Sequence, residues 1–93
     1  MKDRIEIETT EKPHGWLFHV TIDERRRTSH DITLTKNDYY RLTAGRCTAL
    51  KLIEKSVKFL LEREPNTAIL RSFNLPDIAK YFPEYEAEIN KKL

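Results

Sequence analysis

The chain has 93 residues, of which 39% are hydrophobic and 34% charged, and its formal net charge is +2. This length suits one small domain, and four Tyr, four Phe and one Trp can fill its core, which excludes two separate cores and wholesale disorder. No apolar run reaches the ~18–20 residues of a membrane span, and a lone cysteine excludes an internal disulfide. We therefore expect a single domain, residues 1–93, in the reducing cytoplasm and not at a membrane.

Three segments near the start of the chain alternate apolar and polar side chains, a pattern typical of half-buried β-strands. They cover residues 4–9, 16–23 and 30–35. The apolar side of these segments carries Ile5, Ile7, Trp16, Phe18, Val20, Ile22, Ile32 and Leu34. We expect an antiparallel β-meander over residues 1–35, with this side facing the core and a mostly anionic opposite face.

Strand pairing constrains the first hairpin, because residues directly opposite one another lie on the same face of a sheet. The apolar sides of the first two strands coincide only if the loop between them has an even number of residues. Residues 10–15, which contain Pro and Gly, supply such a loop. This loop places Ile7 opposite Phe18 and Glu6 opposite His19.

The second hairpin requires a loop of odd length by the same rule. A three-residue loop, Arg25–Arg27, places Thr21 opposite Asp31, whereas a five-residue loop places Asp23 opposite Asp31. Facing like charges disfavour the longer loop, but three-residue hairpins usually contain a glycine that is missing here. Both loop lengths remain open.

Two helices are predicted after the strands. Thr35 and Asp38 fit a capping box, so a short helix should begin near Lys36 and end at Gly45. Thr48 can cap a longer amphipathic helix that ends by Glu64, before a proline. The expected buried stripe of this helix comprises Leu50, Ile53, Val57, Leu60 and Leu61, and its solvent-facing sector carries Lys51, Lys55 and Lys58.

The remaining residues are divided by prolines into short helical segments. Asn66 can cap a turn of helix bearing Ile69, Leu70 and Phe73. Pro76 suits the first position of a segment with Ile78, Tyr81 and Phe82, and Pro83 precedes a last helix with Tyr85, Ile89 and Leu93. The predicted fold is therefore α+β, with the helical part, residues 36–93, packed on one face of the sheet.

Motifs of catalysis and metal binding are missing from the sequence. The three histidines lack metal-ligand spacing, and two glycines cannot build a phosphate-binding or dinucleotide-binding loop. Cys47 is the one candidate for a reactive residue, because it lies near a helix start and beside Arg46, where a thiolate is favoured. We expect no enzyme and no catalytic, cofactor-binding or metal-binding residues, with a redox or enzymatic role of Cys47 as a secondary hypothesis.

Cationic residues provide the first alternative to a protein-interaction function, the binding of nucleic acid, which ranks ahead of the role of Cys47. Residues 36–64 carry seven Lys/Arg against four Asp/Glu, and the rest of the chain has no basic excess. The candidate contacts to anions or nucleic acid are Arg25, Arg26, Arg27, Lys51, Lys55 and Lys58. Acidic neighbours flank both groups, so a solvated surface is the simpler interpretation.

Two resemblances extend this description. Residues 30–64 are similar in element order to the ribbon-helix-helix DNA-binding module, although the outward positions Asp31, Thr33 and Thr35 lack the basic side chains that would contact DNA. The segments 41–46, 59–65 and 81–86 resemble those of a group of small uncharacterised prokaryotic proteins. That resemblance implies no activity and no site residues.

The function that these patterns favour is a non-enzymatic protein-interaction or accessory module. A three-stranded meander leaves two strand edges open, which suits strand addition or self-association. The candidate interaction surface comprises the apolar groups expected to be exposed, Leu17, Tyr39, Tyr40, Tyr81 and Tyr85. The expected partner is an unidentified protein or a second copy of the chain.

Overall fold

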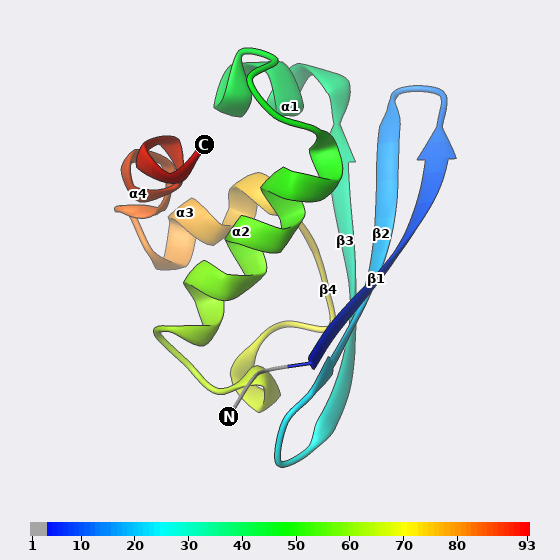
Figure 1. The fold of residues 1–93 in the computed structure, drawn as a ribbon, viewed down its shortest axis with the longest axis vertical. Helices are drawn as coiled ribbons and strands as arrows, with labels where there is room; N and C mark the ends of the chain where they lie inside the picture. Colours follow the sequence, from blue (N-terminus) through cyan, green and yellow to red (C-terminus); the bar gives the residue numbers. More distant parts are fainter. Residues whose placement is uncertain (1–3) are drawn as a thin grey trace.

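The computed structural model describes residues 4–93, which form a mixed four-stranded sheet with four α-helices on one of its faces (Figure 1). The strands are β1 (Arg4–Lys12), β2 (Gly15–Asp23), β3 (Arg27–Thr35) and β4 (Ser72–Asn74), in that spatial order. The helices are α1 (Lys36–Thr43), α2 (Ala49–Leu61), α3 (Ile78–Tyr81) and α4 (Tyr85–Lys92), with 3₁₀ turns at Asn66–Ala68 and Leu75–Asp77. The predicted α+β fold, a meander followed by helices, is confirmed.

The fourth strand was not predicted. β4 lies parallel to β3, and Ile32 is paired with Phe73 at the centre of the contact. The prediction of a helical turn that carries Phe73 is therefore wrong. Three residues are too few to show a strand period, and pairing with β3 selects the extended conformation there. One consequence is that β3 is flanked by β2 and β4, so the strand edge that a ribbon-helix-helix dimer would need is occupied.

The β1–β2 hairpin has the predicted even parity but a different register. Its turn contains only Pro13 and His14, which places Ile7 opposite Val20. The predicted pairs are therefore wrong by two residues, since parity determines the face of each side chain but not the sliding of one strand along the other. The tight turn brings Gly15 against the end of β3, where a Cβ atom would lie 2.1 Å from the carbonyl oxygen of Leu34.

The β2–β3 loop has three residues and begins one position earlier than expected. It comprises Glu24, Arg25 and Arg26, so that Arg27 begins β3 opposite Asp23. In this register Asp23 faces Arg27, and such a pair of opposite charges stabilises the contact between two strands. The predicted Thr21–Asp31 pair is therefore wrong. Asp31 instead lies opposite His19, and their Oδ1 and Nδ1 atoms are 2.7 Å apart.

Both predicted helix caps are confirmed. The side-chain oxygen of Thr35 accepts a hydrogen bond from the Asp38 backbone N–H, and that of Thr48 accepts one from Lys51. The backbone turns left-handed at Ala44 and Gly45, with φ of 53° and 77°, and this ends α1. α2 ends at Leu61, three residues before the predicted limit.

The core lies between the sheet and the helices. The inward side chains Phe18, Val20 and Ile32 are buried as predicted. Of the expected stripe of α2, Ile53, Val57 and Leu60 are buried, whereas Leu50 is exposed. Leu52 and Phe59, which lie on a second apolar side of the helix, are fully buried. The helix has apolar residues on two sides, and the second side packs on α4, where Phe59 contacts the ring of Tyr85.

Candidate functional site

An open apolar pocket of about 330 Å³ lies between the end of α2 and the segment 68–82. A volume of this size is at the small end of the range of ligand sites. Its apolar lining comprises Leu60, Ala68, Ile69, Leu70, Phe73, Ile78, Tyr81 and Phe82. Two carboxylates, Glu64 and Asp77, also line it, and together these features make the pocket the best candidate for a functional site.

Local sequence signals build the wall of this pocket. Pro65 leads into the 3₁₀ turn Asn66–Ala68, after which the chain extends into β4 and presents Phe73 to the interior. Pro76 lies in the first turn of the next 3₁₀ segment, where its missing N–H costs nothing. A reciprocal capping box joins Asn74 and Asp77 and fixes the entry into α3.

Asn66 anchors the start of this wall to the sheet. Its side-chain amide is buried and donates to the Arg26 carbonyl oxygen at 2.8 Å and to Thr28 Oγ1 at 2.9 Å. The predicted role of Asn66 as a helix cap is therefore wrong, because its amide bonds to the β2–β3 hairpin. His30, also buried, adds a second link, with its Nδ1 donating to the carbonyl oxygen of Leu70 at 2.7 Å.

Glu64 is the unusual group in the pocket. Its side chain is partly buried and has no hydrogen-bond or ion-pair partner among residues 4–93. Burial without such a partner raises the pKa of this carboxyl above its ordinary value. The carboxylate therefore lines an apolar cavity without a counter-charge.

The second carboxylate has partners. Asp77 lies 3.2 Å from the Lys80 ammonium one turn along α3, and it accepts a long hydrogen bond from the Asn74 backbone. Lys80 itself is highly exposed, so this pair is a surface contact of small energetic value. The pocket thus combines an unpaired acidic group with a paired one.

Large apolar side chains at the mouth of the pocket face solvent. Tyr81 is 65% exposed and Leu70 is 48% exposed. Exposed apolar groups that border a cavity are typical of surfaces that bind another molecule, whereas scattered single residues are not. Tyr81 was among the predicted interaction residues, but Glu64, Leu70 and Asp77 were missed, since no spacing rule connects them.

The other predicted interaction residues do not join Tyr81. Tyr39 is half-buried between Trp16 and Tyr40, and Leu17 lies on the uncovered face of the sheet. Tyr40 is exposed on α1, away from the pocket lining. Tyr85 is fully buried, so its assignment to a surface is wrong. Its spacing from Ile89 on α4 explains the burial, because both residues lie on the inward side of that helix.

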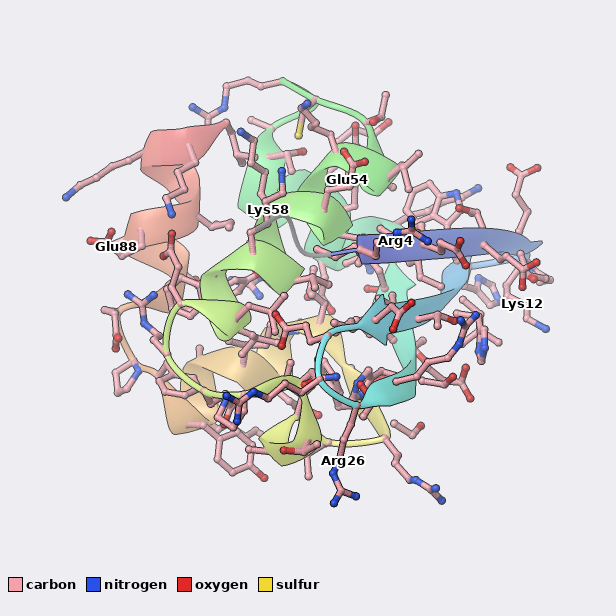
Figure 2. All side chains as sticks on the ribbon, turned by 60° about the horizontal axis from the view of Figure 1, so that its bottom comes forward. Arg4, Lys12, Arg26, Glu54, Lys58 and Glu88 are labelled. Atoms are coloured by element: carbon pink, nitrogen blue, oxygen red, sulfur yellow. The ribbon has the colours of Figure 1, made fainter. Side chains whose placement is uncertain are left out.

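The predicted cationic residues separate into two groups. Figure 2 shows Arg26 projecting from the β2–β3 turn at one end of the molecule, whereas Lys58 lies on α2 near Glu54. The structure adds Arg71 to the first group, because a polar groove of about 450 Å³ is lined by Arg27, Arg71 and neighbouring polar groups. The backbone carbonyl of Arg71 accepts from the Asp31 N–H and so holds this residue beside β3.

The outer face of the sheet is less acidic than predicted. Arg27 lies on it within 4 Å of Glu6 and Asp23, and Lys12 extends the face at the end of β1. These two cations were not counted on that face because the predicted strands were shorter. The resulting face is close to balanced in charge, so repulsion of phosphate by this surface is weaker than expected.

The histidines and the cysteine have different surroundings in the fold. His14 is exposed in the first turn, His19 pairs with Asp31 at the surface, and His30 is buried. Cys47 is half-buried against the core, and the Arg46 guanidinium beside it in sequence bonds to Asn90 and to the Thr43 carbonyl. Among residues 4–93 there is no cluster of three or more His, Cys, Asp or Glu that could hold a metal ion.

Comparisons with known proteins give no relative from which a function could be transferred. No protein-family model, no curated protein and no solved structure matches the chain. Within the described part of the chain, no helix has both the length and the apolar character needed to cross a membrane.

Proposed function

We propose that this protein is a small non-enzymatic interaction module that binds a protein partner through the pocket between α2, β4 and α3. The observation that carries the proposal is the exposure of Leu70 and Tyr81 beside an open apolar cavity. Burial of such groups by a partner is favourable by roughly 25 cal/mol for each Å² removed from water. A cytoplasmic location, in which Cys47 stays reduced, belongs to the same proposal.

The strand edges support this mode of binding better than edge-to-edge association. The sheet has two edge strands, of which β4 is only three residues long and β1 carries charged side chains at Glu6, Glu8, Glu11 and Lys12. Charged residues on an edge strand oppose pairing with another chain. Self-association through an open edge, one of the sequence-based hypotheses, is therefore less favoured than binding at the pocket.

Site-specific photo-crosslinking tests the proposal. A benzophenone amino acid at position 81 should capture a defined partner in cells, and Leu70→Asp should abolish the capture. The same probe at Tyr40 is a matched control, because that side chain is 62% exposed but does not line the pocket. Equal capture from both positions, or capture insensitive to Leu70→Asp, would contradict the proposal.

A second candidate function is the binding of a polyanion, such as a nucleic-acid backbone, at the Arg25, Arg26, Arg27 and Arg71 end. Arg25, Arg26 and Arg71 have no ion pair within the described residues, and Arg27 pairs only at 3.8 and 3.9 Å. Fluorescence anisotropy with labelled DNA and RNA at low salt tests it. Binding should weaken with salt and in the R26A/R71A variant but not in K51A/K58A. A flat curve with every probe rules it out.

A further inference from the structure

The chemistry of the pocket indicates what kind of group enters it. Three aromatic rings, those of Phe73, Tyr81 and Phe82, line the cavity together with aliphatic side chains. The faces of aromatic rings attract cations, and aliphatic walls accept a methylene chain. Neither feature alone distinguishes a cationic ligand from a neutral apolar one.

Glu64 provides the distinction. A carboxylate in a partly desolvated position is costly unless a positive charge lies beside it, and the described residues provide none. Arg63, the nearest cation in sequence, has its guanidinium at 3.0 Å from Glu84 and stacked 3.6 Å from the centre of the Phe59 ring. The Lys80 ammonium forms an ion pair with Asp77. Among residues 4–93, therefore, no cation complements Glu64, and a bound molecule can supply one.

We infer that the pocket takes a protonated amine on an apolar stem, the lysine side chain of a partner protein, with its methylenes against Leu70 and the rings and its ammonium at Glu64. This inference rests on the proposed function and makes it more specific. The volume of about 330 Å³ accommodates one such side chain rather than a folded element.

Small probes that share one five-carbon stem, a single carbon longer than the four methylenes of lysine, test the inference directly. The purified chain is titrated with n-pentylammonium, n-pentanol or hexanoate at pH 7.5, and ¹H–¹⁵N spectra follow the amides of Ile69, Leu70 and Tyr81. Pentylammonium should bind roughly two- to fivefold more tightly than pentanol, the range expected for a partly exposed ion pair, and hexanoate should bind most weakly.

Two variants separate the ion pair from other effects. Glu64→Gln should remove the preference of the pocket for pentylammonium over pentanol and leave pentanol binding unchanged. Glu62→Gln is the matched control, because Glu62 is exposed two residues away and does not line the pocket, and it should keep the full preference.

The remaining outcomes contradict the inference in distinguishable ways. Equal binding of pentanol and pentylammonium, or a preference that survives Glu64→Gln, overturns the assignment of a cation but leaves an apolar docking pocket. No response of these amides to any probe also overturns the inference. The crosslinking from position 81 then decides independently whether the proposed function fails as well.

Discussion

Tyr85 on α4 donates its phenolic hydrogen to Ser56 Oγ on α2 across 2.7 Å, and both side chains are buried. The direction of this bond follows from its neighbour, because the Ser56 hydroxyl donates its own hydrogen to the Leu52 carbonyl oxygen, also at 2.7 Å. Burial raises the pKa of the Tyr85 phenol above its ordinary value of 10.0, so the proton that makes the bond is retained into the alkaline range. The last helix is therefore fixed to the core by a polar contact inside an apolar interface.

Removing the hydroxyl of Tyr85 and removing that of Ser56 should lower the free energy of unfolding by different amounts. Tyr85→Phe removes the donor but leaves Ser56 bonded to Leu52, so we expect a loss of about 1 kcal/mol in the free energy of unfolding. Ser56→Ala leaves a buried phenol without an acceptor and should cost more, up to ~3 kcal/mol. Urea denaturation of both variants and of the double variant measures this difference. A double variant whose loss equals the sum of the two single losses would argue against the contact.

Asn66 should contribute more to the stability of the fold than an ordinary loop residue does. Asn66→Ala removes the amide that bonds to Arg26 and Thr28, and we expect a loss of roughly 2 kcal/mol. Asn66→Asp should be at least as damaging, because it replaces the donor by an acceptor facing the Arg26 carbonyl oxygen. Asn37→Ala, at an exposed position on α1, serves as the control and should be nearly neutral. Thermal unfolding of the three variants provides the comparison.

The two glycines should respond differently to alanine. At Gly15 an added Cβ would lie 2.1 Å from the Leu34 oxygen and 2.8 Å from Thr35 Cα, so backbone must move, and we expect a loss of about 3 kcal/mol. At Gly45 the nearest atom is 3.8 Å away, and only the left-handed backbone is strained, at a cost of about 1 kcal/mol. Equal urea midpoints for the two variants would contradict the observed approach of β2 and β3 at this point.

Glu64 should make stability depend on pH in a defined direction. Its pKa is raised in the folded protein by burial, so the folded state binds this proton more tightly than the unfolded chain does. The free energy of unfolding therefore falls as the pH rises from the ordinary value of 4.5 through the raised folded value. Glu64→Gln should be more stable than the parent at pH 7, and this advantage should disappear below about pH 4. Urea titrations at both pH values measure it, and an advantage that persists in acid would show a cause other than charge.

Local signals account for the parts of the fold that the sequence predicts. The alternation of apolar and polar side chains, the threonine caps and the prolines are each visible within a few consecutive residues. These signals predict the meander, α1, α2 and α4. β4 and the burial of Asn66 depend on contacts with residues far away in the sequence, and nothing in their neighbourhood signals these contacts. The register of the first hairpin was missed for a related reason, because parity has several solutions that differ by two residues.

The candidate site was predicted only at Tyr81. The pocket is assembled from the end of α2, β4, the second 3₁₀ turn and α3, and the sequence separates these elements by different distances. The burial of Glu64 follows from how Leu70 and the following segment return to β3. Only the three-dimensional arrangement identifies a carboxylate in an apolar surrounding.

The late position of β4 in the chain also has a kinetic consequence. Ser72 is 41 positions after its partner Asp31, whereas the hairpins of the meander close over loops of two and three residues. Closure over such a long separation is slow compared with hairpin formation, so the segment that carries Leu70 and Phe73 docks after the meander has formed. Transient opening of this short strand would dismantle the binding cavity while the rest of the sheet stays folded. Hydrogen exchange at Phe73 would then report the fraction of molecules that are competent to bind.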